Sequence, residues 1–365
     1  MKIQAAVVRE KAGPFIIEQV DLDEPKAGEV LVRMVATGLC HTDLVARAQF
    51  LPVPLPAVFG HEGSGIVESV GPGVTKVKAG DHVVMSYLYC GTCPSCKKGI
   101  PSWCLNFLPS NFAGVRSDGS TTMKKGGQAI HGSFFGQSSF GAYALASERN
   151  VVKVQDDVPL EILGPLGCGI QTGAGGVINS LQARPGSSIA VFGVGSVGLV
   201  AVMAAYASGC TTIIAVDVVP ARLKVALEMG ATHTIDSNTV DPVEEIRKIT
   251  GGGVEYSLEC AGIPKVLRQA VDALTWGGVC GLIGVAPMGA EVSLDMQNIL
   301  NGRAVKGIVE GDSNPDVFIP QLIELYKRGR LPFDRIMTFY PFEQINQAAE
   351  DSENGKTLKA VLRFS

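Results

Sequence analysis

Residues 187–198 read SSIAVFGVGSVG, an apolar run followed by a turn that contains Gly193, Gly195 and Gly198. The order strand, glycine-rich turn and helix lets the backbone approach a pyrophosphate, whose charge then sits at the positive end of the helix. The glycine pattern alone is a weak signal. It gains weight because a second apolar run, TIIAVD, ends at Asp217, where a carboxylate would accept hydrogen bonds from the adenosine ribose.

The charge at this position predicts which dinucleotide binds. Asp217 would repel a 2′-phosphate, so we expect NAD rather than NADP, with Arg222 close to the ribose. Ser196 and Val197 open the helix that follows the turn and are expected to contact the cofactor. The competing interpretation is a glycine-rich turn followed by an aspartate that binds nothing.

The segments around this turn alternate between strand-like and helix-like patterns. The expected strands are SSIAVF, TIIAVD, THTID, VEYSLEC and GVCGLIGV, and the expected helices cover residues 197–207, 221–229, 242–249 and 265–274. Such alternation is typical of βαβ units and a parallel sheet. The sequence therefore predicts an α/β protein with a doubly wound parallel-sheet domain over residues 169–310.

The chain before this domain has a different pattern. Short apolar segments are broken by Gly and Pro turns, which predicts a β-rich domain over residues 1–168. Residues 311–365 contain a helix, NPDVFIPQLIELYKRG, and a closing strand, TLKAVLRF, and are expected to return to that first domain. The irregular stretch 105–139 is long for a connection and is expected either to shape a binding cleft or to form an inert surface loop.

Charge and hydropathy exclude several classes of protein. With 31 basic and 35 acidic residues the net charge is -4, which provides no electrostatic surface for nucleic acid or an anionic membrane. No apolar run approaches a membrane span, and the first residues lack the apolar run of a signal peptide. We therefore expect a cytoplasmic protein whose ligand occupies a pocket.

Four of the nine cysteines are closely spaced. Cys90, Cys93, Cys96 and Cys104 form the pattern C-x2-C-x2-C-x7-C, in which four thiolates can surround one ion without an open position. The residues between them contain too few apolar side chains to fold alone, so a metal would hold this lobe, residues 90–104, together. The alternatives are four buried free cysteines or a nucleic-acid zinc ribbon, and Lys97 and Lys98 provide too little positive charge for the latter.

A second group of candidate ligands is dispersed along the chain, each in a Gly-rich turn. It consists of Cys40 in GLCHTD, His61 and Glu62 in GHEGSG, and Cys168 in GPLGCG. Two thiolates and one imidazole leave the fourth corner of a zinc ion open for water or an alcohol, as a catalytic site requires. Taken singly, each residue would more often be a small core residue or a satisfied loop histidine.

Over nearly its whole length the chain resembles the zinc-containing medium-chain dehydrogenase/reductase family, with GHEGSGIVESVG, the four-cysteine lobe and GVGSVG in the family's order. The donor set of two cysteines and a histidine is itself that of alcohol dehydrogenases, so it is part of this resemblance. The resemblance implies a β-rich GroES-like catalytic domain, a Rossmann coenzyme domain, NAD, and two zinc ions per subunit, one catalytic and one structural.

The resemblance also implies roles for single residues. Cys40, His61 and Cys168 match the catalytic zinc ligands, with Glu62 beside the metal as a further candidate ligand. Asp43 matches the hydrogen-bond partner of the ligand histidine, and Thr42 the hydroxyl that binds the substrate oxygen. The residues expected near the cofactor are His41, Thr172 and Lys359. One position departs from the pattern, because Val45 stands where many members have a histidine that relays the proton to solvent.

The resemblance extends to the substrate. The segment SFFGQSSFGAYA, residues 133–144, is similar to the aryl-alcohol and benzyl-alcohol dehydrogenase branch, and Ser86, Tyr87 and Leu88 are candidates to line an apolar pocket. We expect a benzyl-type primary alcohol and its aldehyde, with geraniol-type allylic alcohols as the alternative. The same phenylalanines also suit core packing.

Several other functions are also compatible with the sequence. Within the family, polyol, amino-alcohol and glutathione-adduct oxidation are possible. A zinc-free quinone reductase would have no use for the dispersed ligand group. A non-catalytic sensor that binds zinc and NAD would not need an open coordination position on the metal beside Thr42. By analogy with the family we expect a homo-oligomer, either a dimer or a tetramer.

Overall fold

The chain forms two compact units in the computed structural model, which describes residues 1–364. The first unit contains Met1–Gly169, Asn314–Pro320 and the segment from Asp334 onward; the second contains Ile170–Ser313 and Gln321–Phe333. This division differs from the expected one at residues 311–313 and 321–333, which were expected in the first domain, and at Gly169, which was expected in the second. The boundaries of the functional domains stay a prediction.

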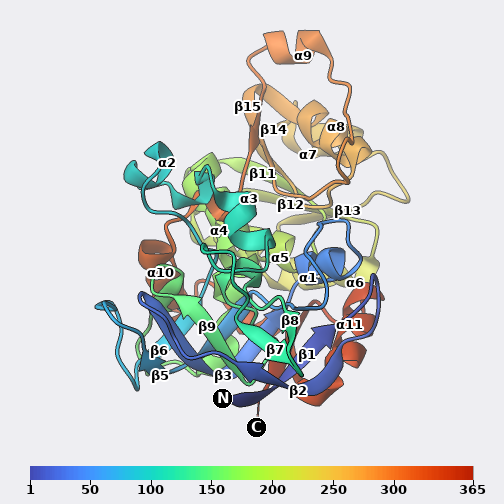
Figure 1. Cartoon of the computed structure of the whole chain (residues 1–365). Coiled ribbons are helices and arrows are strands. Elements are labelled where there is room, and N and C mark those ends of the chain that lie inside the picture. The colour runs from blue at the N-terminus through green and yellow to red at the C-terminus, as the bar shows by residue number, and fades with distance from the viewer. Residues whose placement is uncertain (365) are drawn as a thin grey trace. The chain divides into compact units, whose positions relative to one another are not determined.

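A six-stranded sheet forms the centre of the second unit (Figure 1). All its strands are parallel, in the order β13-β12-β11-β14-β15-β16. This is the doubly wound order 3-2-1-4-5-6 of dinucleotide-binding domains, so the α/β prediction is confirmed. The strands are β11 (Ser188–Phe192), β12 (Thr212–Asp217), β13 (His233–Asp236), β14 (Val254–Glu259), β15 (Leu274–Leu282) and β16 (Ala304–Gly307).

Four helices of this unit, α5 to α8, follow the predicted helical segments to within one or two residues. They pack against the sheet through buried side chains such as Leu199 of α5, Ile246 of α7 and Leu267 of α8. The elements are α4 (Gly169–Gly175), which begins at the unit boundary, η5 (Gly176–Leu181), α5 (Ser196–Ala207), α6 (Pro220–Glu228), α7 (Pro242–Thr250), α8 (Pro264–Asp272), α9 (Met296–Leu300) and η6 (Glu310–Asp312).

The first unit is built on two mainly antiparallel sheets. One has the order β4-β1-β2-β7-β8, and the other runs β10-β6-β5-β3-β18-β17 with β9 also paired to β3. The strands are β1 (Lys2–Val8), β2 (Ile16–Leu22), β3 (Glu29–Leu39), β4 (Ala57–Val58), β5 (Glu62–Val70), β6 (His82–Met85), β7 (Met123–Lys125), β8 (Gln128–Ile130), β9 (Tyr143–Ser147), β10 (Val151–Lys153), β17 (Met337–Pro341) and β18 (Lys359–Arg363).

Short helices connect these strands, and the irregular stretch 105–139 is more ordered than expected. It contributes a helix that packs on the turn at 134–136 and two strands that extend the first sheet. The helical elements are α1 (His41–Arg47), α2 (Pro94–Lys97), η1 (Pro101–Trp103), α3 (Phe107–Phe112), η2 (Phe134–Gly136), η3 (Leu160–Ile162), η4 (Gly164–Gly167), η7 (Phe333–Ile336), η8 (Phe342–Gln344) and α11 (Ile345–Glu353), with α10 (Pro315–Lys327) spanning both units.

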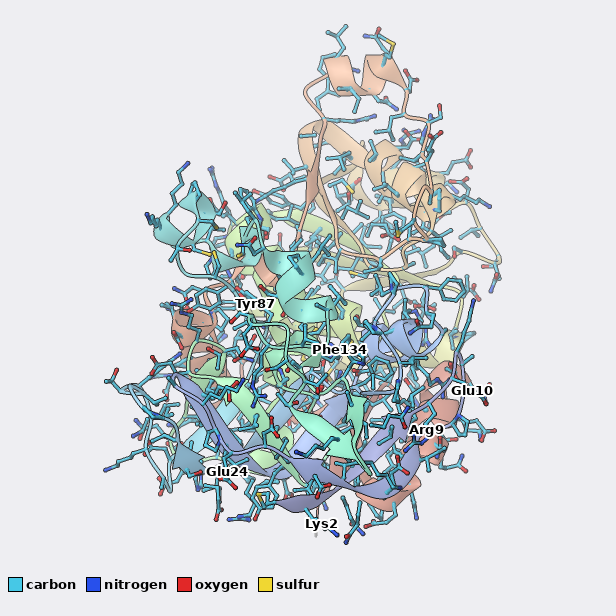
Figure 2. All side chains as sticks on the ribbon, in the orientation of Figure 1. Lys2, Arg9, Glu10, Glu24, Tyr87 and Phe134 are labelled. Carbon is cyan, nitrogen blue, oxygen red and sulfur yellow. The ribbon has the colours of Figure 1, made fainter. Side chains whose placement is uncertain are left out.

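Aromatic side chains fill much of the core of the first unit. Tyr87 and Phe134 are fully buried and lie in its interior in Figure 2, whereas the charged Lys2, Glu10 and Glu24 are exposed. Burying an aromatic side chain contributes roughly 1.5–3 kcal/mol, so this cluster is a major source of stability. Among residues 1–364, no helix combines the length and the apolar character that a bilayer crossing requires.

Candidate functional site

The glycine-rich turn between β11 and α5 has the geometry that dinucleotide binding requires. Gly193 has a φ of 84°, which a residue with a side chain rarely adopts. A Cβ at Gly198 would lie 2.0 Å from the carbonyl oxygen of Gly193, so only glycine lets α5 start this close to the strand. By contrast, Gly195 faces open space, where a pyrophosphate can approach the N-terminus of α5.

Asp217 lies at the carboxyl end of β12, beside this turn. Its carboxylate accepts hydrogen bonds from the backbone N–H groups of Val194 at 2.8 Å, Val218 at 2.8 Å and Val219 at 2.9 Å. The guanidinium of Arg222 is 3.9 Å away. Asp217 thus ties the glycine-rich turn to the end of β12, a structural role that the sequence did not reveal, and its contact with a ribose stays a prediction.

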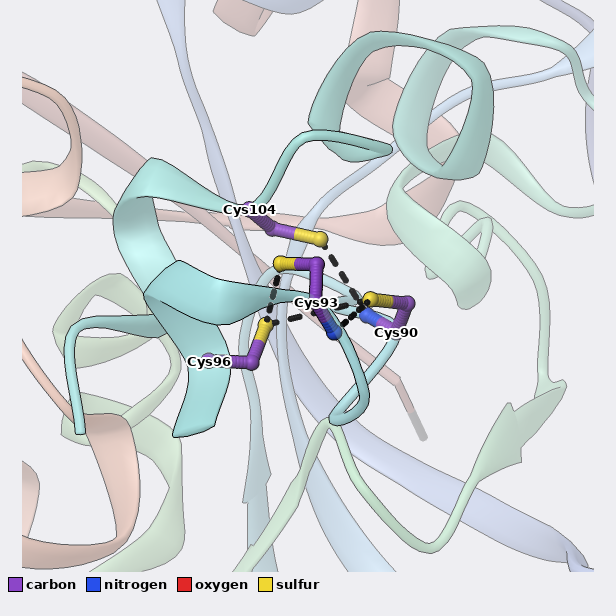
Figure 3. A group of neighbouring side chains, drawn as sticks. All are labelled: Cys90, Cys93, Cys96 and Cys104. Carbon is purple, nitrogen blue, oxygen red and sulfur yellow. Dashed lines mark hydrogen bonds between the residues drawn. The ribbon is translucent and has the colours of Figure 1, made fainter. Parts of the chain in front are cut away.

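The four clustered cysteines converge at one point (Figure 3). Their sulfur atoms all lie within 4.8 Å of one another. Backbone N–H groups point at two of these sulfurs: that of Cys93 lies 3.3 Å from Cys90 Sγ, and that of Cys90 lies 3.3 Å from Cys104 Sγ. Because four soft donors enclose the space, the site fits a closed, structural zinc ion.

The dispersed candidates also converge. Cys40, His61, Glu62 and Cys168 offer ligand atoms that lie within 4.8 Å of one another, and His61 and Glu62 are fully buried. The atom that identifies a metal site is His61 Nε2, which is buried and has no hydrogen-bond partner. A buried imidazole nitrogen is costly to leave unsatisfied, and a metal ion held with the two sulfurs would satisfy it.

The Asp43 carboxylate forms hydrogen bonds to the backbone of Cys40 and to the side chain of His61, and so helps to position both. The Cys40 backbone N–H donates to Asp43 Oδ2 at 2.9 Å, which caps the first turn of α1. The other carboxylate oxygen accepts from the Gly60 N–H at 3.0 Å and from His61 Nδ1 at 2.9 Å. Asp43 therefore engages Nδ1 of His61 and leaves Nε2 available for a metal, while its role beside a bound ion stays a prediction.

The charges of the group are strongly coupled. A hydrogen bond from Cys168 lowers the pKa of Cys40 well below its ordinary value, despite burial. Burial opposes the charged form of His61, yet the Asp43 carboxylate and Cys40 raise its pKa well above the ordinary value. Burial also raises the pKa of Glu62 to about 7, against the effect of the neighbouring Lys359. The cluster thus favours a thiolate donor at Cys40.

Lys359 contacts the metal-ligand group, and its expected contact with the cofactor stays a prediction. Its amino group forms an ion pair with Glu62 Oε2 and donates to the Leu39 carbonyl at 3.4 Å. Only 3% of Lys359 is exposed. Because β18 pairs with β3, the register Ala360 to Leu39 brings this lysine under the metal group, which the sequence pattern could not indicate.

The remaining predicted residues lie on two helices, α1 in the first unit and α4. Thr42, in the first turn of α1, has its hydroxyl 3.7 Å from Cys40 Sγ. His41 precedes it and is exposed, and the half-buried Val45 lies one turn further along. Thr172, on α4 in the second unit, donates to Glu310 Oε2 at 3.4 Å. Their contacts with substrate and cofactor stay predictions.

Sequence reasoning missed the residues that enclose His61. The ring of Phe135 stacks on the imidazole with centroids 4.4 Å apart, and Phe134 meets it edge-on at 5.5 Å. The Gln137 side chain donates to the His61 carbonyl at 3.0 Å. These residues belong to the sequence FFGQ, residues 134–137. From the sequence, its phenylalanines were equally compatible with lining a substrate pocket and with packing in the core.

Comparison with known proteins identifies the family. Residues 26–156 match the model of the alcohol dehydrogenase GroES-like domain, and residues 196–328 match that of the zinc-binding dehydrogenase. Together with the two metal-ligand groups and the Rossmann unit, these matches define a class: the chain belongs to the zinc-containing medium-chain alcohol dehydrogenases.

Several relatives match almost the whole chain. A geraniol dehydrogenase from Castellaniella defragrans is 47% identical over 99% of this chain and 97% of its own length. The crystal structure of benzyl alcohol dehydrogenase from Acinetobacter calcoaceticus is 49% identical, with a TM-score of 0.97 and full coverage of both chains. An alcohol dehydrogenase zinc-binding domain protein from Burkholderia ambifaria is 56% identical, with a TM-score of 0.98, covering 100% of this chain and 99% of the other.

Proposed function

We propose that this alcohol dehydrogenase oxidises benzyl-type primary alcohols to aldehydes, reversibly, with NAD as the hydride acceptor. The observation that carries the proposal is the buried, unpartnered His61 Nε2 beside two cysteine sulfurs, enclosed by aromatic rings. An apolar, ring-lined environment favours a substrate whose carbinol carbon bears an aromatic group. The similarity to a benzyl alcohol dehydrogenase supports the same substrate class.

In this proposal each residue of the dispersed group has a distinct role. Cys40, His61 and Cys168 would hold a zinc ion, and Glu62 would lie beside it as an occasional ligand. The zinc supplies Lewis-acid chemistry that lowers the pKa of an alcohol. The Thr42 hydroxyl would accept a hydrogen bond from the alcohol and relay its proton, by giving up its own, to a cofactor ribose hydroxyl and then to water. Asp43 would keep His61 in the ligating tautomer.

The same proposal assigns cofactor contacts in the second unit. The N–H groups at Ser196 and Val197 would bind the pyrophosphate at the start of α5, and Asp217 would favour NAD over NADP. NAD supplies the hydride-accepting nicotinamide ring. His41, Thr172, Arg222 and Lys359 remain candidates for further contacts, and Lys359 also forms an ion pair with Glu62.

A geraniol-type allylic alcohol is the second candidate. The 47% identity to a geraniol dehydrogenase supports it as well as the comparable identity to a benzyl alcohol dehydrogenase supports the first. Both substrates have an unsaturated carbon next to the carbinol, so an aromatic enclosure suits either.

A kinetic panel tests the proposal. Benzylic, terpenoid allylic and short aliphatic alcohols are each measured with NAD and with NADP. We expect the highest kcat/KM for benzyl alcohol with NAD, and lower values for short aliphatic alcohols, which would leave apolar surface unfilled. A preference for short aliphatic alcohols would contradict the proposed substrate class, and a preference for NADP would contradict the role of Asp217.

We further propose a homo-oligomer that forms through the edge of the second unit's sheet. Strand β16 is an edge strand, so one side of it is open to pairing. Large apolar side chains lie exposed on this unit, with Trp276 at 74%, Met288 at 86%, Met296 at 85% and Leu300 at 77%. Exposed apolar side chains in this number suit an interface better than contact with water.

A further inference from the structure

We propose that Phe135 is a positioning residue for metal binding: a strained turn holds its ring against the face of His61 and thereby fixes the direction of His61 Nε2. This inference rests on the proposed role of His61 as a zinc ligand. It adds a residue that acts through His61 and contacts neither the metal nor the reacting atoms.

The first observation is the stacking geometry. The rings of Phe135 and His61 are 4.4 Å apart between centroids and inclined by 24°, so one face of the imidazole is covered. Phe134 meets the same imidazole edge-on, with an interplanar angle of 82°. Both phenylalanines are buried, at 3% and 0% exposure, so the imidazole has little room to tilt.

The second observation is the backbone conformation of the turn. Phe135 has a φ of 51° and Ser138 a φ of 49°, in the left-handed region that bulky residues avoid. Such conformations persist only where the surroundings enforce them, and they concentrate at functional sites. A turn that merely connected two strands would have no reason to place a phenylalanine here.

The third observation is the set of hydrogen bonds that enforces this conformation. The Asn150 side-chain amide, fully buried, donates to the carbonyls of Phe135 at 3.1 Å, Gly136 at 3.2 Å and Ser86 at 3.2 Å. Gln137 links the same turn to the His61 carbonyl at 3.0 Å. The turn is therefore held at Phe135 and Gly136 by Asn150, which precedes β10, and at Gln137 by the backbone of His61, which precedes β5.

These contacts complement the hydrogen bond to Asp43. That bond restrains the imidazole through a single contact at one edge of the ring, 2.9 Å from His61 Nδ1. Stacking against Phe135 adds a contact over the face of the ring, which restrains its tilt and with it the direction of Nε2. Groups that orient a metal ligand typically change metal affinity by 10–100-fold when they are removed.

The test follows metal release from the purified holoenzyme with a colorimetric chelator. Two metal sites should give two kinetic phases, and the variant Cys168→Ser identifies the phase that belongs to the Cys40, His61 and Cys168 site. The four-cysteine site serves as an internal control in the same molecule. Should the metal content and both phases be unchanged in Cys168→Ser, the proposed function itself fails, independently of Phe135.

The decisive variants are Phe135→Leu, which removes the flat ring, and Phe135→Trp, which retains one. We expect Phe135→Leu to accelerate release from the His61 site about tenfold while the four-cysteine phase stays unchanged, and Phe135→Trp to restore slow release. Asn150→Ala should act in the same direction by freeing the turn. The matched control is Phe140→Leu, because Phe140 is fully buried in the same segment but meets the ring of Phe15 edge-on and does not stack on His61.

Phe135→Met replaces the leucine variant if the latter does not fold, because methionine has similar bulk and no ring face. The inference is overturned if the His61-site phase is unchanged in the ring-less variant, or if both phases accelerate equally, which would indicate general loosening. It is also overturned if Phe140→Leu accelerates the His61-site phase as much as Phe135→Leu does.

Discussion

At the scale of single residues, the site is defined by the polar atoms that remain available once each side chain has made its other contacts. His61 uses Nδ1 for Asp43, and Asp43 uses both oxygens for Cys40, Gly60 and His61. The buried Nε2 of His61 is left without a hydrogen-bond partner. A donor set with one unsatisfied nitrogen and two sulfurs is explained by a metal ion and by little else.

Replacing Asp217 with serine should ease the use of NADP. The 2′-phosphate would no longer meet a carboxylate, and a like charge at about 4 Å costs roughly 1–4 kcal/mol depending on solvent exposure. We expect the NADP to NAD ratio of kcat/KM to rise about tenfold, which corresponds to about 1.4 kcal/mol. Asp236→Ser is the matched control, because Asp236 ends the neighbouring strand β13. An unmoved ratio in Asp217→Ser would refute the cofactor assignment.

Val45 provides a second residue-scale prediction. It lies one turn after His41 on α1, where a relay histidine would carry the substrate proton to solvent. Introducing histidine by Val45→His should make turnover less dependent on buffer concentration and should add a titration near neutral pH to the kcat profile. Val45→Leu controls for the change in bulk. Identical pH profiles and buffer responses in the two variants would show that a histidine at position 45 does not carry the substrate proton to solvent.

At the scale of elements, the periodic segments could be predicted and the irregular ones could not. The helices α5 to α8 begin and end within two residues of their expected bounds, because α5 follows the glycine-rich turn as an apolar, buried helix and the other three begin at a proline. The strands β7 and β8 were missed, since three residues each are too short to show alternation. The turn at Phe135 was missed because its conformation is imposed by Asn150, a residue distant in sequence.

The fold of the four-cysteine lobe is predicted to depend on its metal ion. Helix α2 has four residues, none of them buried, so the lobe needs the metal to fold. Cys93→Ser should leave residues 90–104 open to limited proteolysis and should lower the melting temperature, while NAD binding by the second unit persists. Cys168→Ser is the control and should leave the lobe protected. A protease-resistant lobe in Cys93→Ser would mean that its fold does not depend on the metal.

At the scale of the whole molecule, the group of Cys40, His61, Glu62 and Cys168 is assembled by the fold, whereas the four-cysteine group comes from one segment. Cys40 precedes α1, His61 precedes β5 and Cys168 follows η4, so only the completed first unit brings them together. The sequence could nominate these residues because they resemble a known family pattern. It could not indicate the ion pair of Glu62 with Lys359, which depends on the register of β18 against β3.

The exposed apolar side chains of the second unit lead to a prediction about assembly. The double variant Trp276→Lys and Leu300→Lys places two charges among them, and burying an unpaired charge in an interface costs several kcal/mol. We expect light scattering after size exclusion to report a smaller species than for the unmodified protein. Lys substitutions at the exposed Leu105 and Leu108 of the first unit are the control. Equal masses for all three proteins would contradict the proposed interface.

The central claim is that Cys40, His61 and Cys168 share one zinc ion that is separate from the ion of the four-cysteine lobe. Zinc content per chain, measured by atomic emission on the purified protein and on Cys168→Ser, tests it most directly. We expect two zinc ions per chain in the unmodified protein and one in Cys168→Ser, which should retain its fold and its binding of NAD. Equal zinc content in both proteins would contradict it.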